Sequence, residues 1–91
     1  MMHPYVKYSD GTEVMFSDII ENEDGEETIQ IHFERPTENG FDSVRFELPS
    51  YRIMYKDGNY TDEEIELFKT VIEQGAASFY RWAREGGIQI A

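Results

Sequence analysis

The sequence contains no cysteine, one tryptophan, three prolines and far fewer basic than acidic residues. The absence of cysteine excludes disulfides, thiol nucleophiles and cysteine-ligated metals, and it is compatible with a reducing compartment. The 8 Lys and Arg residues against 19 Asp and Glu give a net charge of −11. Such a charge opposes binding to phosphate backbones and anionic lipids, because both depend on cationic side chains. We therefore expect neither nucleic acid nor a membrane among the partners.

The sequence also lacks a long apolar run. The N-terminal stretch MMHPYVKY has no cationic region followed by apolar residues, so it does not resemble a secretory signal. No stretch is apolar enough over a sufficient length to cross a bilayer. We expect residues 1–91 to form a single cytoplasmic domain with a modest core.

The most strongly patterned stretch runs from Tyr60 to Gly87 and predicts one long amphipathic helix. Thr61 and Glu64 have the spacing of a capping box, and Gly86 suits the left-handed residue that ends a helix. Gly75 either permits close packing or divides the segment into two helices. The apolar stripe follows steps of three and four residues: Ile65, Phe68, Val71, Ile72, Ala76, Phe79, Trp82 and Ala83.

Before this helix, alternation of apolar and polar residues between turn signals predicts antiparallel strands. The predicted strands cover residues 5–8, 12–20, 28–35, 41–48 and 51–56. The second strand should bulge or end near Asp18, and Pro36 to Gly40 should form a turn. In the fifth strand, Tyr51, Ile53 and Tyr55 should share one face. Residues 88–91 either extend an edge strand or fray.

One face of these strands supplies the apolar surface that the helix needs. Its members are Val14, Phe16, Ile29, Ile31, Phe33, Val44, Phe46 and Leu48. The fold class is therefore α+β: an antiparallel β-meander of four to five strands followed by one long C-terminal α-helix packed on one sheet face.

The loop at residues 21–27 carries five carboxylates and raises the question of calcium. With Gly25 at the sixth position of an EF-hand loop, Ile20 and Ile31 would occupy the first and twelfth positions, where carboxylates are required. We interpret the loop as a hydrated hairpin tip, although a weak surface cation site there remains open. No phosphate-binding loop or nucleophile motif is present, so we expect no cofactor.

His32 and Glu34 share the polar face of the best-patterned strand, and Arg45 should lie close to them on the next strand. A histidine beside carboxylates can act as a general base. The same arrangement is also ordinary for a polar sheet face, which is the interpretation we prefer.

Aromatic and arginine side chains are enriched at protein interfaces. The candidates for such an interface are Tyr5, Tyr8, Tyr51, Tyr55, Trp82 and Arg81. Too few cations accompany the tyrosines for a platform that stacks single-stranded nucleic acid. Trp82 also lies on the helix stripe, where core packing would explain it.

Three functional hypotheses remain. The first is a non-enzymatic protein-interaction or regulatory module that acts as a homodimer through a sheet face or edge. The second is a small enzyme that uses His32 with Glu34 or Glu47, which would require a cleft around His32. The third is an acidic nucleic-acid mimic that binds basic proteins.

Overall fold

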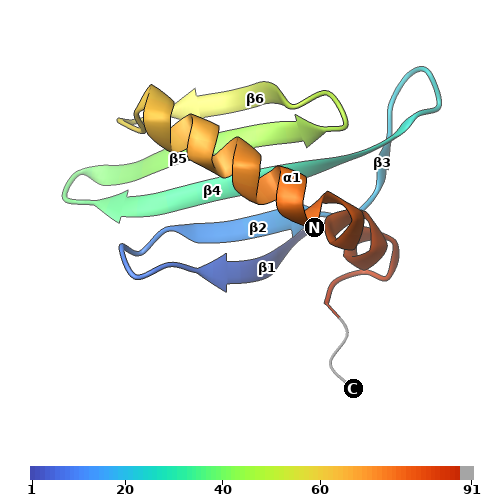
Figure 1. The fold of residues 1–91 in the computed structure, drawn as a ribbon, viewed down its shortest axis with the longest axis horizontal. Coiled ribbons are helices and arrows are strands. Elements are labelled where there is room, and N and C mark those ends of the chain that lie inside the picture. Colours follow the sequence, from blue (N-terminus) through green and yellow to red (C-terminus); the bar gives the residue numbers. More distant parts are fainter. Residues whose placement is uncertain (89–91) are drawn as a thin grey trace.

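The protein, as a computed structural model that describes residues 1–88, is an antiparallel sheet followed by one helix on one of its faces, which confirms the α+β prediction (Figure 1). The elements are β1 (Met2–Lys7), β2 (Glu13–Ser17), β3 (Ile20–Glu21), β4 (Glu27–Thr37), β5 (Gly40–Leu48), β6 (Arg52–Asp57) and α1 (Asp62–Arg84). The main sheet has the order β1-β2-β4-β5-β6, and β3 pairs with β4. The expectation for the C-terminal tail concerns mostly residues 89–91, which lie outside the described part.

The predicted irregularity near Asp18 is confirmed. β2 ends at Ser17 and β3 starts at Ile20, so the predicted strand 12–20 is two strands. The hairpin of β3 and β4 extends beyond the sheet, and the acidic loop forms its tip (Figure 1). There the Asn22 Oδ1 accepts hydrogen bonds from the backbone N–H groups of Asp24 and Glu26, at 3.0 and 2.9 Å.

Two local predictions were wrong. β4 continues through Pro36 to Thr37, and Pro36 pairs with Phe41, so the expected five-residue turn is shorter. In β6, the register shifts at Met54, so Ile53 lies opposite Phe46 while Tyr55 lies opposite Arg45. Because a bulge reverses the alternation, Ile53 and Tyr55 are on different faces of the sheet.

The core lies between the sheet and α1. Every residue of the predicted apolar sheet face is at most 1% exposed. Helix residues buried against it are Ile65, Phe68, Ile72, Phe79 and Ala83. The Phe68 ring stacks on the Phe33 ring with centroids 4.1 Å apart. Burying each large side chain contributes about 1.5–3 kcal/mol, and this contact holds α1 to the central strand β4.

The predicted start and end of α1 are confirmed. Thr61 and Glu64 form the capping box, with the Glu64 N–H donating to the Thr61 hydroxyl at 3.1 Å. At the other end, Gly86 has φ of +77°, and the Gly87 N–H donates to the Trp82 carbonyl at 2.8 Å. This is the Schellman arrangement, in which a left-handed residue lets the chain satisfy the last carbonyls.

Gly75 does not divide α1, which is continuous from Asp62 to Arg84. A Cβ added at Gly75 would lie 3.2 Å from the Phe79 ring. The missing side chain therefore makes room for that ring, which supports the packing explanation of Gly75 over the two-helix alternative.

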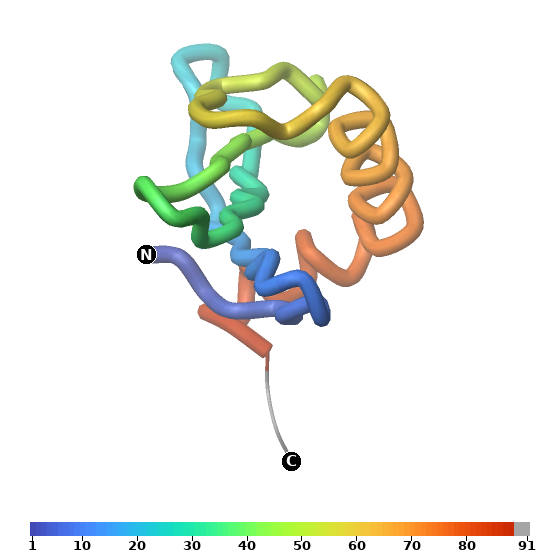
Figure 2. The backbone as a smooth tube through the Cα atoms, turned by 90° about the vertical axis from the view of Figure 1, so that its left-hand side faces the viewer, coloured from blue at the N-terminus to red at the C-terminus, as the bar shows by residue number. Residues whose placement is uncertain are grey.

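α1 crosses the sheet diagonally. Its start lies over the β5–β6 side and its end over the β1–β2 side (Figure 1), and a view turned by 90° shows the helix and the sheet as two layers (Figure 2). The β1–β2 hairpin therefore lies beside the first half of α1 and is not covered by it. Within residues 1–88, no helix has the length and apolar character needed to span a membrane.

The capping box makes a testable contribution to stability. Thr61→Ala removes the hydroxyl that accepts the Glu64 N–H, and we expect a loss of about 1 kcal/mol in the free energy of unfolding, measured by urea denaturation. Thr70→Ala is the matched control, because Thr70 lies on the exposed side of α1 and its hydroxyl donates to the Glu66 carbonyl of the same helix. A larger loss in Thr70→Ala than in Thr61→Ala would contradict this account.

Candidate functional site

The structure brings together the predicted polar group on the sheet face opposite α1. Arg45 lies directly across from His32, and Tyr55 lies directly across from Arg45. The Arg45 Nε donates to the His32 Nδ1 at 3.2 Å, and the His32 Nε2 lies 3.5 Å from a Glu34 carboxylate oxygen. The arrangement fixes the tautomer: Nδ1 accepts, so the ring proton is on Nε2 and faces Glu34.

His32 is only 7% exposed although α1 lies on the other face of the sheet. Its burial, followed by the charge of Arg45, lowers the pKa of His32, and Glu34 opposes this shift only in part. Both ring nitrogens have partners within the sheet. A substrate would have to displace Arg45 or Glu34 to reach the ring, so the geometry suits a neutral, structural histidine better than a general base.

The predicted aromatic residues do not form one surface. Tyr5 and Trp82 are in contact, with ring centroids 5.6 Å apart, and the Arg81 guanidinium lies 5.8 Å from the Trp82 ring. Tyr8 lines a hollow beside the first half of α1, whereas Tyr51 lines another hollow. Tyr55 is on the opposite face of the sheet from the helix.

The most connected polar group in the described chain was not among the predicted site residues. The Arg35 guanidinium, at the end of β4, lies 2.7 Å from the Asp42 carboxylate, 2.8 Å from Glu64 and 3.6 Å from Asp10. It also lies over the Tyr60 ring, 4.6 Å from its centroid. Four segments of the chain therefore meet at one cation. Arg35 and Asp42 are cross-strand partners in the β4–β5 hairpin, so strand register alone predicts their contact. It does not predict the contacts of Arg35 with the other partners.

Each of the three carboxylates divides its two oxygens in the same way. One oxygen faces Arg35, and the other accepts a backbone N–H: that of Asn59 for Asp42, of Thr61 for Glu64 and of Thr12 for Asp10. Two of the three N–H groups, those of Asn59 and Thr61, belong to the connection between β6 and α1, and the third, that of Thr12, belongs to the β1–β2 turn. Arg35 thereby joins two bends of the chain to β4. We call Arg35 and its three partners, Asp10, Asp42 and Glu64, the Arg35 cluster.

The electrostatics of the Arg35 cluster follow from these bonds. Arg35, and then the Asn59 N–H, lower the pKa of Asp42. The backbone N–H of Thr61 lowers the pKa of Glu64, and the N–H of Thr12 lowers that of Asp10, with Arg35 adding to both shifts. The carboxylates in turn raise the pKa of Arg35. All four groups are therefore charged at neutral pH.

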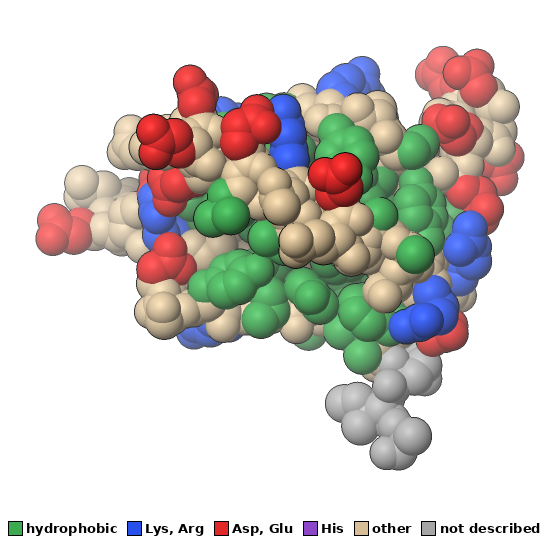
Figure 3. Space-filling model, viewed as in Figure 1, with side chains coloured by type: hydrophobic (Ala, Val, Ile, Leu, Met, Phe, Trp, Pro, Cys, Tyr) green, Lys and Arg blue, Asp and Glu red, His purple; other side chains and the backbone are tan. Residues whose placement is uncertain are grey.

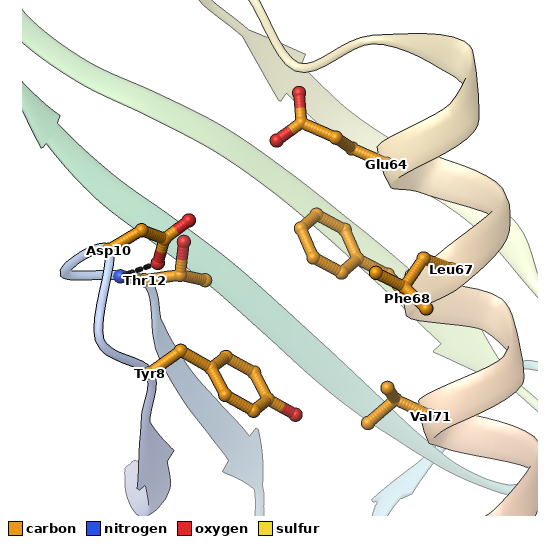
Figure 4. A pocket seen from close by; sticks show the side chains of 7 residues that line it. All are labelled: Tyr8, Asp10, Thr12, Glu64, Leu67, Phe68 and Val71. Atoms are coloured by element: carbon orange, nitrogen blue, oxygen red, sulfur yellow. Dashed lines mark hydrogen bonds between the residues drawn. The ribbon is translucent and has the colours of Figure 1, made fainter.

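Beside the Arg35 cluster lies a mainly apolar hollow of about 270 Å³ between α1 and the β1–β2 hairpin. Figure 4 shows the Tyr8 ring pointing across it toward Val71, with the carboxylates of Asp10 and Glu64 at one end. We call it the hairpin hollow; its lining residues are Tyr8, Asp10, Thr12, Glu64, Leu67, Phe68 and Val71. Tyr8 is the only one of them predicted as an interface residue.

No protein-family profile, curated protein sequence or solved structure matches this chain. Within residues 1–88, no group of three or more histidine or carboxylate side chains is arranged to hold a metal ion. The described residues offer a closed polar network around His32 on one face of the sheet and an open apolar hollow on the other.

His32 predicts a specific pH dependence. The unfolded histidine titrates near pH 6.5, whereas the folded one titrates lower, so the unfolded chain gains its proton first as the pH falls. The contribution of neutral His32 is therefore present above about pH 6.5 and declines below it, by at most about 1.4 kcal/mol per pH unit.

Urea denaturation at pH 7.5 and pH 5.5 measures this contribution of His32 to the free energy of unfolding. We expect His32→Gln, which keeps an acceptor for Arg45, to lose less stability between the two pH values than the unsubstituted protein. His3→Gln is the control, and it should retain the pH-dependent contribution of His32 to stability. If His32→Gln and the unsubstituted protein have equal pH dependence, the histidine is not held neutral by the fold.

The Arg35 cluster predicts a second pH effect, at lower pH. Because the folded pKa values of its carboxylates are depressed, their stabilisation is present above about pH 4 and is lost as the pH falls through the folded values. We expect Arg35→Gln to lower the urea midpoint at pH 7, and its difference from the unsubstituted protein to shrink below pH 4. Arg52→Gln, which alters an exposed pair with Glu47 at 3.6 Å, should have a much smaller effect. If Arg35→Gln and Arg52→Gln lowered the urea midpoint equally, the Arg35 cluster would not stabilise the fold as proposed.

Proposed function

We propose that this protein is a non-enzymatic protein-interaction module that self-associates weakly through the edge strand β6. The observation that carries the proposal is the exposure of that strand. All six residues of β6 are exposed, and Ile53, Met54 and Tyr55 form a run of large apolar side chains that are 40%, 40% and 51% exposed. Ile53 and Tyr55 lie on opposite faces of the sheet, so β6 exposes apolar side chains on both faces, and an exposed apolar edge strand favours pairing with another strand.

The two edges of the sheet differ. Both edge strands have a register shift, but only β1, at the other edge, contains a proline, Pro4. Proline has no N–H to donate to a new strand, so it protects an edge. β6 contains no proline, and its only strand neighbour in the described sheet is β5. Strand addition is therefore better supported at β6 than at β1.

A second copy of the chain fits the charge of β6. The strand begins with Arg52 and ends with Lys56 and Asp57, so it is not acidic although the whole chain carries −11. Antiparallel pairing brings the start of one strand toward the end of the other, and so Arg52 of one copy toward Asp57 of the next. The bulge at Met54 and the repulsion between two acidic chains limit the affinity. We therefore expect a reversible dimer that is strengthened by salt.

The alternatives have less support. An enzyme that uses His32 would need access to a ring whose two nitrogens are already occupied. Mimicry of nucleic acid would need carboxylates in rows, whereas the Arg35 cluster engages Asp10, Asp42 and Glu64 internally. The homodimer, the regulatory role and the cytoplasmic location remain part of the proposal.

Sedimentation equilibrium over a range of protein and salt concentrations tests the proposal. We expect the average mass to rise toward that of a dimer at high protein concentration, and more so at higher salt. Ile53→Lys should weaken association at least about tenfold, or 1.4 kcal/mol, because it places a second cation beside Lys56. Leu67→Ser, on α1, is the control and should leave association unchanged. A monomer under all conditions, or equal loss in both variants, would contradict the proposal.

A further inference from the structure

We infer that the hairpin hollow is a second binding site, which takes a large apolar side chain from a basic segment of a partner protein. It is separate from the proposed self-association surface, because the β1–β2 hairpin and β6 are at opposite edges of the sheet. The two proposals therefore stand or fall independently.

The hollow results from the diagonal seating of α1. Phe68 is buried and stacks on Phe33, forming the floor, whereas Leu67, its neighbour on α1, is directed outward and is 59% exposed. Tyr8, 39% exposed, forms the opposite wall (Figure 4). In Figure 3, apolar side chains gather along the strip between α1 and the β1–β2 hairpin. The side chains of Leu67 and Tyr8 therefore remain partly exposed to solvent, although each faces an apolar neighbour.

The size and lining of the hollow favour a protein side chain as its occupant. Sites for small molecules usually enclose about 300–1,000 Å³ and have several convergent polar groups. This hollow measures about 270 Å³, is open at the surface, and has its carboxylates at one end only. One large aliphatic or aromatic side chain fits such a space, as an anchor residue does when a helix docks in a groove.

The charge around the hollow favours a basic segment. At one end, the Asp10 side chain is 53% exposed and that of Glu64 is 31% exposed. Arg35 neutralises one of the three carboxylates that it contacts, so the Arg35 cluster keeps an excess of two negative charges. Glu63, one helical turn before Leu67, is also exposed and lies on the same side of α1. A Lys or Arg next to the anchor residue would meet these carboxylates.

The same charges disfavour other occupants. A second copy of this chain carries −11, and β6, which has two basic residues and one acidic, is the strand proposed for self-association. Nucleic acid and anionic lipid would bring phosphates to the acidic end of the hollow. A basic amphipathic segment is the class that satisfies both the apolar wall and the carboxylate end.

Binding of a designed probe tests this inference. The probe is a synthetic amphipathic helical peptide of Leu and Lys, with Leu at every third and fourth position, added to dilute ¹⁵N-labelled protein. We expect the largest changes in chemical shift at Tyr8, Leu67 and Val71. A peptide of the same charge with Ala in place of Leu should bind at least about tenfold more weakly, because it lacks the anchor.

Three variants separate this site from general attraction to an acidic surface. Leu67→Ser removes one wall and should weaken binding at least about tenfold, and an unchanged circular dichroism spectrum should confirm the fold. Glu63→Gln should weaken binding about twofold to fivefold and reduce its dependence on salt. Glu73→Gln, with the same change of charge, is the matched control, because Glu73 lines a different hollow with Tyr51. It should bind like the unsubstituted protein.

Several results would overturn the inference. They are equal binding of the Leu and Ala peptides, equal effects of Glu63→Gln and Glu73→Gln, shift changes centred away from the hairpin hollow, and no binding of the Leu peptide. Each of them would mean that the hollow is an ordinary irregularity of the surface.

Discussion

The contact of one guanidinium with three carboxylates determines how the connections of this protein are held. Arg35 lies near the end of β4, the longest described strand, and each carboxylate facing it also accepts an N–H, two of them from the β6–α1 connection and one from the β1–β2 turn. A paired charge with several hydrogen bonds is tolerated near a core where an isolated one is not. Gly58 reflects the tightness of this region: a Cβ added there would lie 2.5 Å from the Asp42 carboxylate. The Arg35 cluster therefore fixes where α1 begins.

The start of α1 and the stack of Phe68 on Phe33 together set its diagonal course. The Phe79 ring packs against Phe16, with centroids 5.7 Å apart, and so directs the end of the helix over β2. A diagonal helix covers the centre of the sheet and leaves one corner beside the β1–β2 hairpin. The hairpin hollow lies there, and the Arg35 cluster supplies its charged end. The same interactions that stabilise the fold thus produce the proposed binding site.

The parts of the fold that depend on local sequence were predictable. Capping and strand periodicity depend on residues that are only a few positions apart. Neighbouring residues were therefore enough to predict the cap at Thr61, the left-handed Gly86 and the alternation around Ile31. The bulge at Met54 was not predictable in this way, since it depends on how β6 pairs with β5. It moved Tyr55 to the other face of the sheet.

The candidate site was predictable only in part, for the same reason. His32, Glu34 and Arg45 were grouped correctly, because two adjacent strands with a short turn have a simple register. Arg35 contacts residues 10, 42 and 64, which only the tertiary fold brings together. Leu67 has no special pattern in the sequence, and its exposure follows from the orientation of α1. Sites made by contacts between distant segments leave little signal in a single sequence.

The most direct measurement of the central claim is the NMR spectrum of the arginine side chains at neutral pH and in acid. We expect the Arg35 Nη groups to rotate slowly and to exchange slowly with water at neutral pH, and both rates to rise when the carboxylates are protonated. Arg52, whose side chain is 65% exposed, provides the reference for a mobile guanidinium. If Arg35 rotates and exchanges as fast as Arg52 at neutral pH, it does not hold the β1–β2 turn and the β6–α1 connection together, and the structural role of the Arg35 cluster is wrong.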